Sequence, residues 1–366
     1  MAKFICPFCI REYNKSEVLY VCPDCGKATT PNRFEREPIK CKTAKCGGLA
    51  SLPKCPKCSE LIPKMVLETP YLPISIIGTK NSGKTSYITT MLHELGTFSG
   101  LRLALGYLTK DAFDHQNENY SRIYEKHTRP DSTQGGANRP QIWCIKNLQK
   151  KHGMGVPAYT FTIYDGAGED NENNLDPSSD VCRYINASKA IILAIDPLLL
   201  LKIREHRIVD LNLMGNSLAE NEDTTKNIED FINSVAVYIK QIRGMRNTQQ
   251  LKIPVAVVLT KLDTLINHKL FVPKTIIRNR CSNIRNGSVD ISEMVIVDQE
   301  IRSWLKEIGE GTIINLLKFH FKEFFFFGVS SYGSPPKDAY TLAEDIQPHR
   351  VLDPILWLFN KAKFID

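Results

Sequence analysis

The stretch Ile74-Ser75-Ile76-Ile77 is followed at once by Gly78-Thr79-Lys80-Asn81-Ser82-Gly83-Lys84-Thr85. Its first four residues form an apolar run typical of a buried parallel strand, and the next eight fit the phosphate-loop pattern G-x4-G-K-T. An amphipathic helix is predicted directly behind the loop, because apolar residues recur there at i, i+3, i+4 and i+7: Ile88, Met91, Leu92 and Leu95. Strand, glycine-rich loop and helix in this order predict a nucleotide-phosphate site.

The residue types of this loop suit phosphate binding. Glycines let the backbone wrap closely, so that its N–H groups point at the phosphates. Lys84 is expected to bridge the β- and γ-phosphates, and the Thr85 hydroxyl is expected to ligate magnesium. The full set of expected nucleotide contacts in this stretch is Gly78, Lys80, Asn81, Ser82, Gly83, Lys84, Thr85 and Ser86.

Outside the loop, strand-like runs alternate with helical patterns. This alternation predicts an α/β fold with a mostly parallel sheet flanked by helices. Further central strands are expected at 159–164, 190–195, 255–259 and 324–327, with an edge strand at 142–145. Further helices are expected at 111–127, 228–242, 301–317 and 353–363.

Three short motifs follow the ends of these expected strands. Asp165, directly after the strand expected at 159–164, can hold magnesium through water, and the Gly168 N–H can meet a γ-phosphate. Asp263, in T-K-L-D at 260–263, can accept both hydrogen bonds from the N1–H and N2–H2 edge of guanine, which adenine lacks. The stem of Lys261 can cover the base, with Thr260 in support. Backbone N–H groups at Ser330 and Ser331 can meet the guanine O6.

Together and in this order, the motifs resemble those of the Ras-like and translation-factor-like GTPases, over roughly residues 72–366. The Asp196-Pro197 step, the cysteine-rich start and the closing D-P-I-L-W-L at 353–358 are similar to the double-GTPase family of bacterial conflict systems. The resemblance implies GTP or GDP with Mg²⁺ as ligands and a switch role; slow hydrolysis is our expectation from Glu169 and from the lack of a clear arginine candidate.

Several positions depart from that resemblance. Thr260 stands where the common form has Asn, which weakens one supporting hydrogen bond, and Glu169 stands where Ras-like proteins carry a water-orienting Gln. The long spacing between Lys84 and Asp165 implies an insertion, set at about 97–140, and a second is set at about 264–297. For the switch I threonine, Thr133 is our choice over Thr128, although a loop threonine without a ligand is nearly as good an interpretation.

Eight of the eleven cysteines lie in the first 58 residues, in four closely spaced pairs. Such pairs are typical of tandem zinc ribbons, because zinc takes four thiolates in a tetrahedron. We assign the pairs sequentially, although an interleaved pairing stays open. The first ion would be bound by Cys6, Cys9, Cys22 and Cys25, and the second by Cys41, Cys46, Cys55 and Cys58. The remaining three cysteines, expected to be buried or half-buried, are Cys144, Cys182 and Cys281.

The predicted organisation is therefore tandem zinc ribbons at 1–64, an extended linker at 65–73 and a P-loop domain at 74–366. With all eight thiols used as ligands, the ribbons suit structure or recognition better than catalysis. Their lysines can contact nucleic acid or an acidic protein, or simply face solvent. Two zinc sites bring eight thiolates and four metal charges, which lowers the formal charge from +7 to about +3. This balance argues only weakly for a polyanionic partner.

Neither a membrane span nor a secretion signal is visible in the sequence, so we expect a cytoplasmic protein without membrane contact. The expected partners are a guanine nucleotide and a protein bound through the ribbons or the switch segments. Two rival functions remain: a nucleic-acid-binding zinc-ribbon protein gated by nucleotide, and a non-hydrolysing scaffold that keeps its nucleotide.

Overall fold

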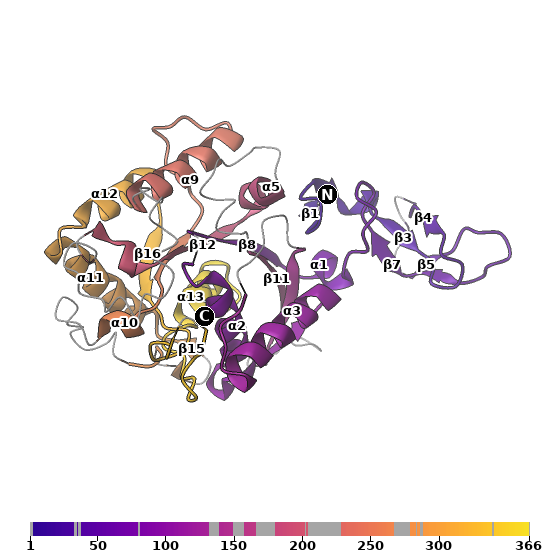
Figure 1. Ribbon diagram of the computed structural model, residues 1–366. Helices are drawn as coiled ribbons and strands as arrows, with labels where there is room; N and C mark the ends of the chain where they lie inside the picture. The colour runs from indigo at the N-terminus through magenta and orange to yellow at the C-terminus, as the bar shows by residue number, and fades with distance from the viewer. Residues whose placement is uncertain are drawn as a thin grey trace.

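In the computed structural model, the residues that are described form a seven-stranded central sheet in the order β16-β13-β12-β8-β11-β10-β9 (Figure 1). They cover 3–32, 35, 38–79, 81–131, 139–148, 157–165, 180–201, 203, 228–266, 279–282, 284–285, 288–338 and 340–365. The strands are β8 (Tyr71–Gly78), β9 (Leu103–Tyr107), β10 (Gln141–Asn147), β11 (Ala158–Asp165), β12 (Ala190–Ile195), β13 (Val255–Leu259) and β16 (Phe324–Gly328). Five of them pair in parallel, while β10 is antiparallel to both its neighbours, β11 and β9. The predicted α/β class with a mostly parallel sheet is confirmed.

Helices cover both faces of this sheet. They are α2 (Lys84–Thr97), α3 (Lys110–Tyr120), α5 (Asp180–Ala187), α9 (Ile228–Ile242), α10 (Asp263–Ile266), α11 (Ile291–Glu307), α12 (Gly311–His320) and α13 (Asp353–Lys361). Shorter pieces are the 3-10 turns η2 (Ser99–Leu101) and η4 (Pro197–Leu199), the π-helical turn η3 (Ser121–Glu125) and the hairpin of β14 (Ile284–Arg285) with β15 (Ser288–Val289).

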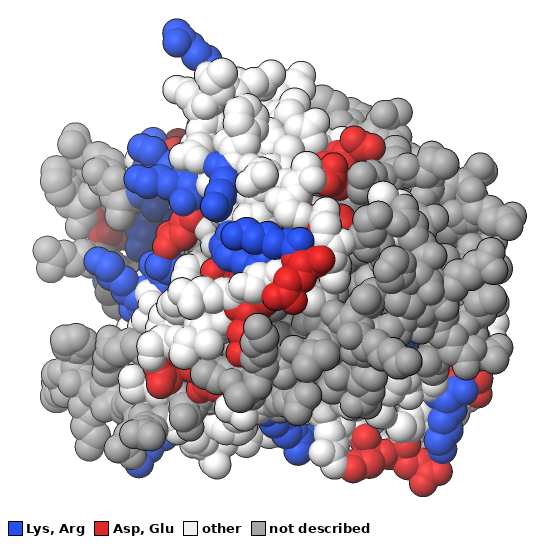
Figure 2. Space-filling model, turned by 90° about the vertical axis from the view of Figure 1, so that its left-hand side faces the viewer, with Lys and Arg blue, Asp and Glu red and all other residues white. Residues whose placement is uncertain are grey.

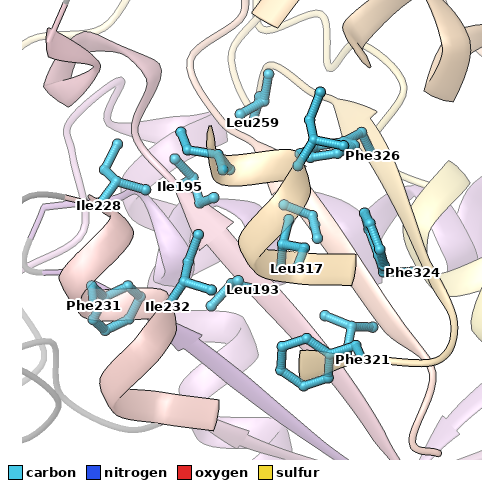
Figure 3. Close-up of a cluster of buried hydrophobic side chains, with 14 of the residues drawn as sticks. Leu193, Ile195, Ile228, Phe231, Ile232, Leu259, Leu317, Phe321, Phe324 and Phe326 are labelled. Carbon is cyan, nitrogen blue, oxygen red and sulfur yellow. The ribbon is translucent and has the colours of Figure 1, made fainter. Parts of the chain in front are cut away.

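Two apolar cores lie on opposite faces of the sheet, because successive side chains of a strand point to opposite sides. Leu193 and Ile195 of β12 join the core under α9, α11 and α12, whereas Ile192 joins the core under α2 and α13. Figure 3 shows the first core, where Phe324 and Phe326 of β16 meet Leu317 and Phe321. Burial on both faces explains why the strands are apolar throughout.

Three sequence expectations were wrong in detail. β10 is not an edge strand, because β9 pairs with its outer side. The helix expected over 301–317 is two helices, α11 and α12, separated at Gly309, whose φ of +85° belongs to the left-handed region where glycine ends helices. The connector expected to be extended contains the helix α1 (Lys64–Glu68), which buries Val66 and Leu67.

The cysteine-rich N-terminal module projects to one side of the sheet (Figure 1). It consists of β1 (Lys3–Ile5), β2 (Glu12–Asn14), η1 (Lys15–Glu17), β3 (Leu19–Val21), β4 (Ala28–Thr29), β5 (Ile39–Lys40), β6 (Leu49–Ala50) and β7 (Leu52–Lys54). Its near end packs against the sheet, since one apolar cluster joins Cys6 and Cys55 to Ile142 of β10. The Tyr164 hydroxyl of β11 also donates to the Pro7 carbonyl, at 3.2 Å. The module and the sheet therefore share a core. Among the described residues, we find no helix with the length and apolar character that crossing a bilayer requires.

Candidate functional site

The phosphate loop connects β8 to α2 at the carboxyl edge of the parallel strands. Its first glycine, Gly78, has no room for a side chain, since a Cβ there would lie 2.6 Å from the Ala194 carbonyl oxygen of β12. Gly83 is the N-cap of α2, with φ +79°, and Asn81 also has a positive φ of +59°. Two residues in the left-handed region curl the loop around the helix N-terminus, where backbone N–H groups attract anions.

Lys84 is buried inside this loop, with 6% of its surface exposed. Its ammonium donates to the carbonyls of Gly78 and Thr79, at 3.0 and 2.9 Å, and lies 3.5 Å from the Ser82 hydroxyl. The amine is thus already held where a phosphate would enter the loop, which fits the role predicted for Lys84.

The two expected magnesium ligands meet across the sheet. The Thr85 hydroxyl donates to Asp165 Oδ2 at 3.3 Å, joining the first turn of α2 to the end of β11. Burial raises the pKa of Asp165, while Lys84, His115 and the Thr85 hydrogen bond lower it. A hydroxyl and a carboxylate at this spacing are oxygen donors of the kind that Mg²⁺ takes together with phosphate oxygens.

The guanine-reading motif lies on the same edge, after β13. Thr260 is 2% exposed and uses both its N–H and its hydroxyl to donate to the Ile195 carbonyl, at 3.0 and 3.2 Å. Lys261 places its ammonium 2.5 Å from Asp196 Oδ2. Burial raises the pKa of Asp263, and a hydrogen bond from the Ser330 side chain lowers it. The structure therefore brings Asp263 together with the serine motif after β16.

Serines expected at the nucleotide have neighbours that the sequence did not indicate. The Ser86 hydroxyl lies 2.6 Å from the Tyr332 hydroxyl, which ties α2 to the segment after β16. Ser330 is 1% exposed and exchanges backbone hydrogen bonds with His349, whereas Ser331 is half-buried. Tyr332 was missed by sequence reasoning because it belongs to no recognised motif, and Asp196 was noted only in the Asp196-Pro197 step, with no role at the nucleotide site.

Other candidates cannot be placed. Lys80, Thr133, Gly168 and Glu169 lie outside the described residues. Thr128, the second choice for switch I, forms an antiparallel bridge with Thr341.

The eight N-terminal cysteines form two clusters of four. One holds Cys6, Cys9, Cys55 and Cys58, and the other holds Cys22, Cys25, Cys41 and Cys46. The sequential pairing was therefore wrong: the first pair joins the last, and the two middle pairs join each other. The chain folds back on itself through β3 and β7, which pair antiparallel and bring Cys55 beside Cys9.

Sulfur spacing tests whether these clusters fit zinc. The Sγ–Sγ distances are 3.9 Å for Cys6–Cys58 and 3.6 Å for Cys9–Cys55. In the second cluster, Cys22–Cys46 is 3.7 Å and Cys25–Cys41 is 3.6 Å. A tetrahedron with Zn–S bonds of about 2.3 Å has S···S edges of about 3.8 Å. Both clusters fit one zinc ion each. Of the other cysteines, Cys144 is buried and Cys281 half-buried, as expected, while the Cys182 side chain is not among those described.

Comparison with known proteins adds a family match. The sequence model of the Double-GTPase 2 family matches residues 72–331, from β8 to just beyond β16. No curated protein matches the chain. The Arl6 BBS3 small GTPase from Trypanosoma brucei, solved with the nucleotide analogue GppNp, aligns at 14% identity over 81% of this chain and 99% of its own, with a TM-score of 0.34. The S. cerevisiae Ski7 GTPase-like domain, bound to GDP and inorganic phosphate, aligns at 15% identity over 83% of this chain and 52% of its own, with a TM-score of 0.35.

Proposed function

The chain belongs to the Double-GTPase 2 family, and on that premise we propose that it binds guanine nucleotides with magnesium and hydrolyses GTP slowly, as a switch. The observation that carries the proposal is the 3.3 Å contact between the Thr85 hydroxyl and Asp165. The two residues come from separate motifs, 80 positions apart, and meet directly beside the buried ammonium of Lys84.

In this proposal, the loop from Gly78 to Thr85 binds the phosphates through backbone N–H groups, with Lys84 between the β- and γ-phosphates. Thr85 and Asp165 would hold the magnesium ion. Bound magnesium would neutralise charge on the β- and γ-phosphate oxygens. Asp263 accepts from the guanine N1–H and N2–H2 edge, and the segment at Ser330 and Ser331 donates to O6.

Hydrolysis is proposed to be slow because Glu169 replaces the usual Gln. An ionised carboxylate accepts a hydrogen bond from water but donates none, and it adds negative charge near the phosphates. A partner or second copy that supplies an arginine would stabilise the charge that spreads over the transferred phosphoryl group. Single-turnover assays should show a low rate that Lys84→Ala abolishes. A fast rate that does not change with protein concentration would contradict this proposal.

Isothermal titration of the full chain with GDP, GTP and ATP, with and without Mg²⁺, tests the central claim. We expect tight Mg²⁺-dependent binding of GDP and GTP and none of ATP at matched concentrations. Thr85→Ala should remove most of the magnesium dependence, whereas Thr85→Ser should keep it. Thr89→Ala is the matched control, since Thr89 lies one turn further along α2 and donates to the Thr85 carbonyl. Equal affinity for ATP and GTP would overturn the guanine assignment.

We further propose that the zinc module recognises a protein partner. In support, the second zinc cluster lies at the far end of the module from the sheet (Figure 1), and Lys40, Lys42 and Lys45 around it are exposed. None of the described cysteines is in a disulfide, which fits the expected cytoplasmic placement. Nucleic-acid binding is the rival role. On the side of the molecule opposite the module, the described surface mixes basic and acidic side chains (Figure 2), so it offers no basic patch there that would extend a nucleic-acid site beyond the ribbons. Gel shifts of the full chain at several salt concentrations would decide, because phosphate contacts make binding strongly salt-dependent.

A further inference from the structure

Asp196 is a buried carboxylate that none of the nucleotide motifs uses. It follows the last residue of β12, and 4% of its surface is exposed. Strands β12 and β13 are parallel neighbours, with Ile195 opposite Leu259. Asp196 therefore lies beside Thr260 and Lys261, at the edge of the sheet where the base is expected.

Both oxygens of this carboxylate are bound. Oδ1 accepts from the Leu198 N–H at 3.0 Å, at the start of the turn η4, where Pro197 follows Asp196. Oδ2 lies 2.5 Å from the Lys261 ammonium. The backbone contact fixes the direction of the carboxylate, so the lysine is held at one defined place. A carboxylate buried without a cation would be costly, and the pairing with Lys261 offsets part of that cost.

Lys261 needs such a restraint. Its φ is +53°, in the left-handed region that residues with a side chain rarely adopt. Its side chain is 28% exposed, so without a partner it would sample many rotamers. Beside it, Thr260 bonds twice to the Ile195 carbonyl, which fixes the end of β13 against the end of β12. With backbone and ammonium both fixed, the apolar stem between them has little freedom left.

We propose that Asp196 is a positioning residue for guanine recognition, which holds the Lys261 side chain in place before the nucleotide arrives so that its stem covers the base. This inference rests on the proposed function. It assigns to the Asp196-Pro197 step the support that Asn gives in the common form of the motif, where this chain has Thr260. Because Lys261 would contact the base and not the phosphates, losing this restraint should weaken the binding of GMP, GDP and GTP by the same factor.

Asp196→Asn tests the proposal cleanly. Asparagine keeps a side-chain oxygen for the Leu198 N–H but loses the charge that holds Lys261. Ordering one long side chain at the moment of binding should weaken affinity by about three- to tenfold, by the same factor for GDP and GTP. GTP turnover should show a raised KM with kcat unchanged. Asp298→Asn is the matched control. Asp298 is also buried, and it accepts from one cation, Arg302, and from one backbone N–H, that of Phe326. It lies on α11 and joins that helix to β16, away from the base site. Its loss should leave GDP affinity unchanged.

A double variant separates positioning from a merely structural role. Lys261→Ala should weaken GDP binding at least as much, and adding Asp196→Asn to it should cost nothing more. Fully additive losses, or unchanged GDP affinity in Asp196→Asn, would overturn the proposal. If Asp196→Asn fails to fold, Lys261→Arg and Lys261→Gln serve instead. Arginine keeps the ion pair and should bind GDP within about threefold of the parent, whereas glutamine should not. Equal losses in these two variants would also overturn it. A parent protein that binds no guanine nucleotide would instead refute the proposed function, and the inference with it.

Discussion

Replacing Gly78 by alanine should both destabilise the protein and disable the phosphate loop. The added Cβ would lie 2.6 Å from the Ala194 carbonyl oxygen and 2.7 Å from the Ser82 hydroxyl, where ordinary contacts begin at about 3.4 Å. The deficit is therefore about 0.8 Å. Ser82 can rotate away, but Ala194 is the partner of Gly78 in the ladder of β8 with β12, so relief requires backbone movement. Overpacking of this kind costs about 1–3 kcal/mol.

Movement of the loop should also reduce GDP affinity more than about tenfold, because the backbone N–H groups would no longer converge on the phosphates. Urea denaturation and titration with GDP measure the two effects separately. Gly96→Ala provides a control that should change the free energy of unfolding in the opposite direction. Gly96 lies in α2, and its Cβ would meet Leu105 at an ordinary 3.6 Å, so the change should stabilise the helix by about 0.5–1 kcal/mol. A Gly78→Ala protein that binds GDP as tightly as the parent would refute the steric reasoning.

Three further predictions follow from the zinc clusters and the base site. Elemental analysis should give two zinc ions per chain, and Cys41→Ser and Cys55→Ser should each leave one. Only Cys55→Ser should lower the free energy of unfolding of the sheet, because its cluster includes Cys6 and Cys9, between which the Pro7 carbonyl accepts from Tyr164 of β11; equal effects in a denaturant titration would argue against that link. Asp263→Asn should shift preference from guanosine to xanthosine nucleotides, since an amide can donate to the C2 carbonyl of xanthine, and unchanged selectivity in a competition assay would remove Asp263 from the base site. Because burial raises the pKa of Asp263, GDP affinity should fall on acidification earlier than for an exposed carboxyl, and a flat profile between pH 7 and about pH 4 would contradict this.

Much of the sheet could be predicted from the sequence because its central strands are buried on both faces. Runs such as Val255–Leu259 are apolar throughout and stand out against helical patterns. β9 escaped detection for the opposite reason: Leu103–Tyr107 alternates with Ala104 and Gly106, which bury little surface, and none of its residues is fully buried. Without β9, β10 could only be placed at the edge.

Some contacts of the candidate site could likewise be predicted from the sequence and others could not. Contacts within the phosphate loop, such as those of Lys84, follow from local spacing. Contacts between distant segments do not, because they depend on which strand ends become neighbours. Asp196 and Lys261 are 65 positions apart, and Ser86 and Tyr332 are 246 apart. The cysteine pairing failed for this reason too. Four closely spaced cysteine pairs offer zinc the same ligands in any combination, and only the pairing of β3 with β7 selects one combination.

The nested arrangement of the cysteines implies an order of assembly during synthesis. The inner cluster joins positions 16 and 24 residues apart, and the outer one joins positions 46 and 52 apart. The last inner ligand, Cys46, leaves the ribosome before Cys58, and the shorter loops cost less entropy to close. The inner zinc should therefore be captured first, and it shortens the remaining loop that the outer zinc must close. The finished outer site then offers its apolar side to Ile142, which is translated later. The zinc available at the moment of translation should therefore influence how readily the sheet that follows begins to fold.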